Sequence, residues 1–237
     1  MGIYRGPNII TDGLVFAIDA GSERSYPGSG TALNSLVNTS QTGTLKNGVG
    51  FSSSNGGTWD FDGIDDYMTT TSEAYPVDGT DPFTIEVWIM IPTGATWYNS
   101  GSGTSIIGRG SYNGSIGIFR KGTDTMTAWL RLNGGNLYSA SVSGLQRDVF
   151  HQIVSTFNGV DTIKCYHNGT YNSQEVNSNN AGTVDGGGFS LGGNLAFGGS
   201  NGGYGEGSIP LARVYNRELT ASEVTQNFNA QKSRFGL

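Results

Sequence analysis

The chain has 237 residues, of which only 14% are charged, and carries 39 glycines and a formal net charge of −6. Its lysines and arginines are scattered, so it lacks the basic stripe that a nucleic-acid partner requires. We expect neither an export signal nor a membrane anchor, because the N-terminus has no apolar core and no later run is long enough to cross a bilayer. The single cysteine, Cys165, excludes an internal disulfide, and the length favours one domain.

Short apolar runs with alternating polarity recur along the chain between clusters of Gly, Asn, Asp and Ser, a pattern typical of strands joined by tight turns. In the clearest, 83–91, every odd-numbered residue is apolar and the even-numbered ones are mixed, which predicts a central strand. The other predicted strands are 14–19, 58–61, 66–70, 105–109, 115–120, 126–132, 137–142, 150–157, 162–167, 189–192 and 208–215. So many strands favour two stacked sheets over one open sheet.

Turn and helix signals complete this prediction. Asn-Gly pairs at 113–114, 133–134, 158–159 and 168–169 tolerate positive φ and predict hairpin connections. The predicted helix follows Thr220, which can form a capping box with Glu223, and its residues Val224 and Phe228 fall on one face. We expect this helix to pack on the outside of the sandwich.

The distribution of carboxylates and histidines argues against catalysis. A retaining glycosidase needs two carboxyl groups about 5 Å apart, yet the strand 83–91 holds only Glu86. Asp60 and Asp62 have strand-like spacing but run directly into a turn. His151 and His167 both fall in predicted strands and suggest neither a catalytic triad nor a zinc site. The sequence therefore predicts no catalytic residues and no enzyme activity.

Three aspartates in one predicted turn, Asp62, Asp65 and Asp66, leave two interpretations open. They can supply oxygen ligands to Ca²⁺, which takes six to eight oxygens. They can equally belong to a hairpin turn in which each carboxylate accepts hydrogen bonds from local backbone N–H groups. Apart from calcium, we expect no cofactor.

Aromatic residues in predicted loops are the candidates for binding carbohydrate or a protein partner. They are Trp97, Tyr98, Tyr112 and Tyr204. Sugar sites combine an exposed aromatic face with polar groups, but exposed aromatics serve protein interfaces equally well. The acidic turn beside Tyr67 can join such a site only if these loops converge.

Five segments match a known domain in order and spacing: 61–67 (FDGIDDY), 83–88 (FTIEVW), 105–110 (SIIGRG), 166–169 (YHNG) and 214–224 (VYNRELTASEV). Together they resemble the laminin G-like, concanavalin A-like lectin and glucanase superfamily. The resemblance implies an all-β, two-sheet antiparallel jelly-roll sandwich with a short C-terminal helix over residues 13–237, after an N-terminal arm, 1–12. Two departures are Phe150 in place of a frequent tryptophan, and Pro210 and Leu211 in place of acidic residues that could ligate a cation.

The runs 12–21 (DGLVFAIDAG) and 25–31 (SYPGSGT) are similar to versions of this domain in structural proteins of tailed, especially marine, bacteriophages. This resemblance implies a non-enzymatic virion protein, such as a capsid decoration or a fibre or tail component, assembled in the host cytoplasm with capsid or tail proteins as partners. An alternative is a carbohydrate-binding adhesin module for host-surface glycans; a glycoside hydrolase ranks third. Apolar arm residues, among them Ile3, Tyr4 and Ile10, are expected to pack against the sandwich or a partner subunit.

Overall fold

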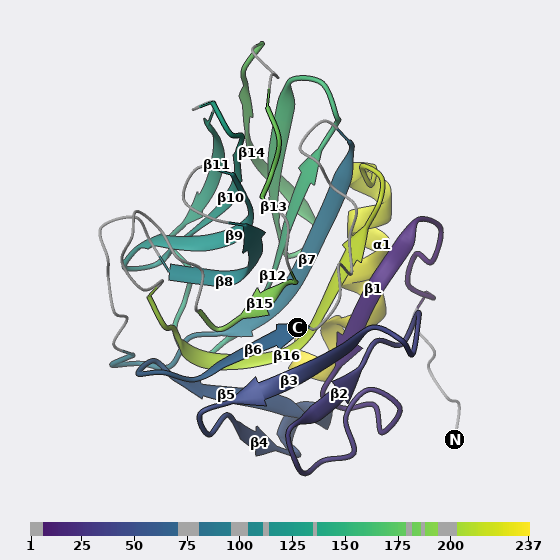
Figure 1. Ribbon diagram of the computed structural model, residues 1–237, viewed down its shortest axis with the longest axis vertical. Coiled ribbons are helices and arrows are strands. Elements are labelled where there is room, and N and C mark those ends of the chain that lie inside the picture. Colours follow the sequence, from purple (N-terminus) through teal and green to yellow (C-terminus); the bar gives the residue numbers. More distant parts are fainter. Residues whose placement is uncertain are drawn as a thin grey trace.

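Alternating polarity along the strands produces two sheets, each with an apolar face that it buries against the other (Figure 1). The computed structural model describes residues 7–70, 81–95, 104–110, 114–134, 137–178, 182–185, 188–193 and 203–237. All strand pairings within the sheets of the described residues are antiparallel. No helix in this part of the chain is long and apolar enough to span a membrane.

The first sheet, called sheet 1, follows the strand order β14-β13-β12-β7-β16-β5-β4, with β1 pairing on β16. Its strands are β14 (Thr170–Val176), β13 (Thr162–His167), β12 (Phe150–Phe157), β7 (Phe83–Met90), β16 (Glu206–Tyr215), β5 (Thr58–Asp62), β4 (Gly50–Ser52) and β1 (Leu14–Asp19). The predicted central strand is therefore confirmed as β7, which lies between β12 and β16.

Sheet 2 follows the order β11-β10-β9-β8-β15-β6-β3-β2. Its strands are β11 (Leu137–Ser143), β10 (Thr125–Arg131), β9 (Ser115–Gly122), β8 (Thr104–Gly110), β15 (Ser190–Leu191), β6 (Tyr67–Thr70), β3 (Thr42–Lys46) and β2 (Ala32–Asn34). The chain crosses from sheet 1 to sheet 2 between β5 and β6, so the turn 63–66 lies at the rim of the sandwich.

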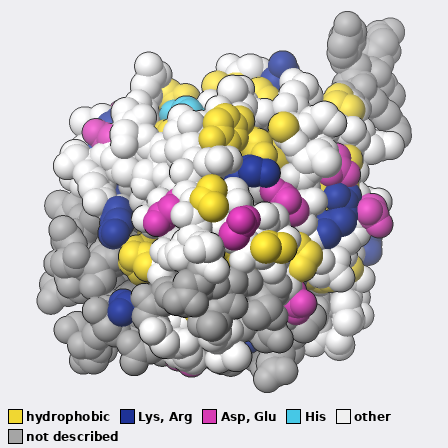
Figure 2. Space-filling view, turned by 90° about the horizontal axis from the view of Figure 1, so that it is seen from above, with side chains coloured by type: hydrophobic (Ala, Val, Ile, Leu, Met, Phe, Trp, Pro, Cys, Tyr) yellow, Lys and Arg dark blue, Asp and Glu magenta, His cyan; other side chains and the backbone are white. Residues whose placement is uncertain are grey.

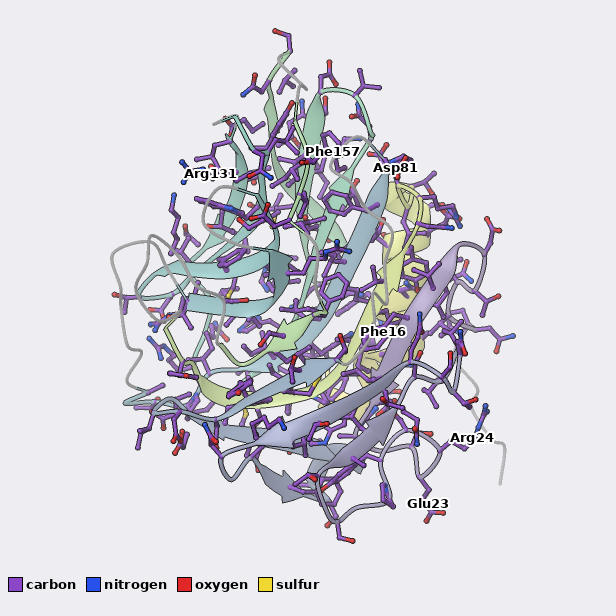
Figure 3. All side chains as sticks on the ribbon, in the orientation of Figure 1. Phe16, Glu23, Arg24, Asp81, Arg131 and Phe157 are labelled. Carbon is purple, nitrogen blue, oxygen red and sulfur yellow. The ribbon has the colours of Figure 1, made fainter. Side chains whose placement is uncertain are left out.

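The main core lies between the two sheets. Phe16 and Phe157, labelled in Figure 3, are both fully buried in it, as are the odd-numbered residues of β7. Cys165 is also fully buried there, and burial raises the pKa of its thiol to about 12. The thiol therefore acts as a small core residue, as the sequence predicts.

The C-terminal helix covers the outer face of sheet 1. Helix α1 (Ala221–Gln231) begins at Thr220, whose side chain accepts a hydrogen bond from the Glu223 N–H in the predicted capping box. It continues into the 3-10 helix η2 (Lys232–Phe235), and a second short 3-10 helix, η1 (Ser54–Gly56), precedes β5. Trp88 stacks on Phe235 at a centroid distance of 4.4 Å. The second face of β7, predicted to be amphipathic, is thus buried as well.

The described part of the N-terminal arm, residues 7–12, packs along α1. The Ile10 N–H donates to Asn227 Oδ1 at 2.8 Å, and the Tyr215 hydroxyl donates to the Ile10 carbonyl at 3.1 Å. Gln226 Nε2 donates to the Asn8 carbonyl at 2.8 Å. The expected packing of the arm against the sandwich is confirmed for this part, while residues 1–6 lie outside the described ranges.

The surface carries charges of both signs. On the face shown in Figure 2, acidic and basic side chains lie among hydrophobic and uncharged ones, without a patch of one sign. Ion pairs such as Arg234–Asp19, at 2.9 Å, take up several of the basic groups. The described part of this face therefore offers no basic stripe to a polyanion.

Candidate functional site

The turn between β5 and β6, residues 62–66, is built as the aspartate spacing predicts for a hairpin. Gly63 takes a positive φ of 74°. Asp62 Oδ1 accepts hydrogen bonds from the backbone N–H groups of Ile64, at 2.8 Å, and Asp65, at 3.4 Å. Asp66 Oδ2 accepts a hydrogen bond, at 3.2 Å, from the Asp62 N–H. Local backbone bonding thus accounts for one oxygen of Asp62 and one of Asp66.

The same turn brings three carboxylates together. One oxygen each from Asp62, Asp65 and Asp66 lies within 4.8 Å of the others. Asp62 and Asp65 are exposed, whereas Asp66 is only 3% exposed. Burial raises the pKa of Asp66, and the charges of Asp62 and Asp65 raise it further. Throughout the described ranges, no basic side chain forms an ion pair with these three groups.

Two tyrosines adjoin this acidic turn. Tyr67 begins β6, and Tyr204 lies just before β16, so the fold brings together two residues far apart in sequence. Their ring centroids are 6.2 Å apart at an interplanar angle of 42°, and both side chains are partly exposed. The pKa of Tyr204 is raised first by burial and then by the nearby Tyr67 and Asp65.

Two neighbouring loops hold these groups in place. Asn47 Nδ2 donates to the Asp65 carbonyl at 2.9 Å and so joins the β3–β4 turn to the acidic turn. Gly193, at a φ of +145°, lies so close to Tyr204 that an added Cβ would be 2.9 Å from its ring. A side chain at Gly193 would displace Tyr204, so this glycine is required for the approach of the two loops.

The sequence left open whether the acidic turn and the predicted aromatic residues lie close together. The structure brings some of them together. Asp62, Asp65, Asp66 and Tyr204 share one site with Tyr67, which we call the acid–tyrosine site. The remaining predicted aromatics, Trp97, Tyr98 and Tyr112, lie outside the described residues. Sequence reasoning did not identify the supporting residues Asn47 and Gly193. The sequence offered only one indication of them, which is that Asn and Gly are residue types common in turns.

The chemistry of the acid–tyrosine site suits a polyhydroxylated or cationic ligand. Aromatic rings offer flat apolar faces with a polar hydroxyl at one end. Carboxylate oxygens accept hydrogen bonds from ligand hydroxyl groups and also coordinate hard cations. A sugar presents both an apolar C–H face and a rim of hydroxyl groups, so it matches this combination.

Glu86, the carboxylate of β7, has a different environment. It is fully buried beneath α1 on the outer face of sheet 1. Glu86 Oε1 accepts hydrogen bonds from Gln152 Nε2 at 2.9 Å and Arg213 Nη1 at 3.0 Å, and a longer one from Trp88 Nε1. Glu86 Oε2 accepts one from Asn227 Nδ2 at 2.9 Å. This network attaches the helix to the sheet and leaves Glu86 inaccessible to substrate.

The two histidines contact each other inside sheet 1. His151 Nδ1 and His167 Nε2 are 2.9 Å apart, and His151 Nε2 lies 2.9 Å from the Gln146 carbonyl. The carbonyl can only accept, so His151 Nε2 carries a proton and its Nδ1 accepts from His167 in the neutral pair. Burial lowers the pKa of both residues, that of His167 to about 4 with a further contribution from His151. Both side chains are satisfied within strands, as predicted.

The family model described as the concanavalin A-like lectin/glucanases superfamily matches residues 61–225. A search of curated proteins found no match. Among solved structures, the binding domain of Paraclostridial Mosquitocidal Protein 1 is similar, with a TM-score of 0.71, 16% identity, and coverage of 92% of this chain and 52% of the other. The Botulinum neurotoxin serotype G binding domain is similar as well, with a TM-score of 0.70 and 16% identity. That match covers 93% of this chain and 51% of the other.

A third similar structure is the Botulinum neurotoxin serotype D ligand binding domain in complex with N-acetylneuraminic acid. It has a TM-score of 0.73 at 13% identity and covers 94% of this chain and 52% of the other. The chain thus spans about half the length of each of these structures. At such identities the likeness shows a shared β-sandwich fold and no more.

Proposed function

Because the chain belongs to the concanavalin A-like lectin/glucanase superfamily, we propose that it is a glycan-binding module. Its binding surface is the acid–tyrosine site, with Tyr67 and Tyr204 as the stacking rings and the 62–66 turn as the polar rim. The single observation that carries this proposal is the approach of Tyr204 to Tyr67 beside three carboxylates. Two partly exposed rings next to a set of hydrogen-bond acceptors match a sugar better than a purely apolar partner.

The roles of the residues follow from their exposure. Tyr204 and Tyr67 are partly exposed, so a sugar ring can lie against them without a large rearrangement of the protein. Asp65 is exposed and close enough to Tyr204 to raise the pKa of that tyrosine, so its carboxylate can accept bonds from ligand hydroxyl groups. The similar Botulinum neurotoxin serotype D domain was solved in complex with N-acetylneuraminic acid, so acidic glycans belong in the test. Neutral glycans belong in it as well, because the three carboxylates of the turn repel an anionic sugar.

The test is a glycan-array screen followed by calorimetric titration of any glycan that binds. Tyr204→Ala is expected to weaken binding about tenfold, equivalent to about 1.4 kcal/mol, because a central stacking surface is lost. The matched control is Tyr171→Ala on β14. Tyr171 is 48% exposed and makes an edge contact with Tyr166, so it resembles Tyr204 in chemistry but lies away from the turn. Equal losses for both variants, or none for Tyr204→Ala, would refute the proposed site.

We also propose that the protein binds its glycan without hydrolysing it. A buried Glu86 that accepts four hydrogen bonds cannot serve as a mobile acid or base on a bound sugar. Asp60 accepts hydrogen bonds from Ser208, at 2.6 Å, and Thr58, at 3.1 Å, within sheet 1. Incubating a bound glycan with the protein should therefore release no reducing ends. Release of reducing ends that depends on either carboxylate would contradict this.

A second role, as a virion structural protein of a tailed bacteriophage, rests on the similarity of 12–21 and 25–31 to such proteins. The two roles are compatible, since a surface protein of a particle can bind host glycans through its loops. In this proposal the arm and the outer surface contact capsid or tail proteins. Immunogold labelling of purified particles tests it: labelling on heads, fibres or tails supports the role, and unlabelled particles oppose it.

A further inference from the structure

A pocket lies between β1, the described part of the N-terminal arm and the end of α1. Its volume is about 450 Å³, within the range of roughly 300–1,000 Å³ that is typical of small-molecule sites. The arm forms one wall and is attached to α1 through the hydrogen bonds of Asn8 and Ile10. The loop after β2 forms another wall, because the Leu36 N–H donates to the Ala17 carbonyl of β1 at 2.7 Å. Hydrogen bonds thus hold both walls in place, so the pocket is formed before any ligand binds.

Most of the residues that line this pocket are apolar. They come from β1, the loop after β2 and α1, and include Leu14, Ala17, Leu36, Val37 and Ala230. Val37 is 44% exposed, so the protein itself does not cover this apolar surface. The one carboxylate in the lining is that of Asp19, and Arg234 offsets its charge with Nη1 at 2.9 Å from both oxygens. The pocket therefore offers an apolar surface without an unpaired negative charge.

Arg213 of β16 is the basic residue in the lining, and it is almost completely buried. Its side chain is 5% exposed. Among the described residues, its hydrogen-bond partner is Glu86 Oε1, which lies 3.0 Å from Nη1. The guanidinium also carries N–H donors on Nε and Nη2, and no acceptor in the described part of the chain is bonded to them. Buried donors without an acceptor are costly, so this arginine is suited to a ligand that supplies one.

We propose that this pocket binds a small organic carboxylate with an apolar body. The carboxylate accepts hydrogen bonds from the Arg213 guanidinium, whose planar fork matches two carboxylate oxygens, and the apolar body lies against the aliphatic walls. Glu86 leaves part of the positive charge of Arg213 available. Its carboxylate is also stabilised by neutral donors, which are Trp88 Nε1, Gln152 Nε2 and Asn227 Nδ2.

This pocket is separate from the acid–tyrosine site. The two lie towards opposite ends of β16, where Glu206 pairs with Asp62 of the acidic turn and Arg213 pairs with Ala17 of β1. The inference is therefore independent of glycan binding, and every measurement below is made without a glycan.

The test titrates the isotope-labelled full chain with three probes and follows the backbone amides by heteronuclear NMR. Phenylacetate carries both the charge and the apolar body, phenylacetamide has the same shape without the charge, and acetate lacks the apolar body. We expect phenylacetate to cause saturable shifts at Ala17, Leu36 and Val37. Phenylacetamide should bind at least about tenfold more weakly, because it loses the charge-assisted hydrogen bonds, and acetate should not saturate. Tyr204→Ala should leave the affinity for phenylacetate unchanged.

Arg213→Lys tests the role of the guanidinium. Lysine keeps a positive charge beside Glu86 but lacks the planar fork, so phenylacetate binding should weaken at least about tenfold. The matched control is Arg24→Lys, the same change at an exposed arginine outside the pocket, labelled in Figure 3, and it should not alter the affinity.

A second pair of variants decides the question if Arg213→Lys fails to fold. Ala230→Leu places a larger side chain in the pocket from α1 and should weaken phenylacetate binding at least about tenfold, because it occupies the space of the apolar body. Ala221→Leu makes the same change at the exposed start of α1 and should have no effect. The inference would be overturned by the absence of saturable shifts with phenylacetate, by equal affinities for phenylacetate and phenylacetamide, or by equal affinities in the two leucine variants.

Discussion

Two buried carboxylates in this molecule have opposite surroundings. Glu86 accepts four hydrogen bonds under α1, one of them from the buried guanidinium of Arg213. Asp66 has one backbone donor and faces two other carboxylates. Burial alone therefore does not distinguish a structural acid from a binding acid. The difference lies in whether the protein supplies the donors itself or leaves an oxygen for something else.

The largest expected effect comes from removing the satisfied carboxylate. Glu86→Ala should lower the free energy of unfolding by about 3–5 kcal/mol, because Arg213 is left as a buried, unpaired charge. Denaturant unfolding measures this. The control Glu23→Ala removes an exposed carboxylate in a turn, labelled in Figure 3, and should change stability by less than about 0.5 kcal/mol. Similar values for the two variants would contradict a structural role for Glu86.

An intermediate effect is expected from the neutral histidine pair, in which the buried His151 and the half-buried His167 are hydrogen-bonded to each other. The folded pKa values lie below the unfolded value of about 6.5, that of His167 at about 4. The unfolded chain therefore binds more protons between these values. Stability is complete above pH 6.5 and falls as the pH drops towards 4.

Unfolding curves at pH 7.5 and pH 5 measure this effect against a variant. We expect the wild type to lose about 1–2 kcal/mol between these values after allowance for solvent screening of the half-buried His167. His167→Gln keeps a donor for His151 Nδ1 and removes one titrating group, so it should lose less. A wild type and variant with the same pH dependence would show that other groups cause it.

The smallest expected effect has the opposite sign. In the presence of a chelator, Asp66→Asn should raise the free energy of unfolding by about 1 kcal/mol, because it removes one of three repelling charges. The same order in saturating Ca²⁺ would favour the hairpin interpretation of this turn, and a reversed order would favour the cation interpretation. Denaturant unfolding with and without Ca²⁺ measures both values. Destabilisation by Asp66→Asn in both conditions would place Asp66 with Glu86 as a structural residue.

Several elements were predictable because local pattern and tertiary environment agree. β1, β12 and β13 match their predicted bounds, and the Thr220–Glu223 capping box starts α1 as expected. Strands β2, β3, β4 and β14 were not predicted. β14, TYNSQEV, is an edge strand without a buried residue, so it has no apolar alternation to detect. The burial of Trp88 under η2 also depends on a contact between distant segments.

The candidate site was predictable only in part for the same reason. The Asp62–Asp66 spacing is local and indicated both a hairpin and a cation site, and the structure contains the hairpin bonds and the carboxylate cluster together. The approach of Tyr204 to Tyr67 is a contact between the segment before β16 and a strand of sheet 2. The pairing of β16 with β5 places Glu206 opposite Asp62 and so brings the segment before β16 to the acidic turn. The alternation of apolar and polar residues within one segment carries no information about this pairing.

We propose that the acid–tyrosine site, not the Glu86 network, is where this protein binds a glycan. The most direct test is a crystal structure of the protein with the best glycan from the array. We expect a sugar ring against Tyr204. A sugar bound on another surface, with the acid–tyrosine site empty, would contradict the proposed site.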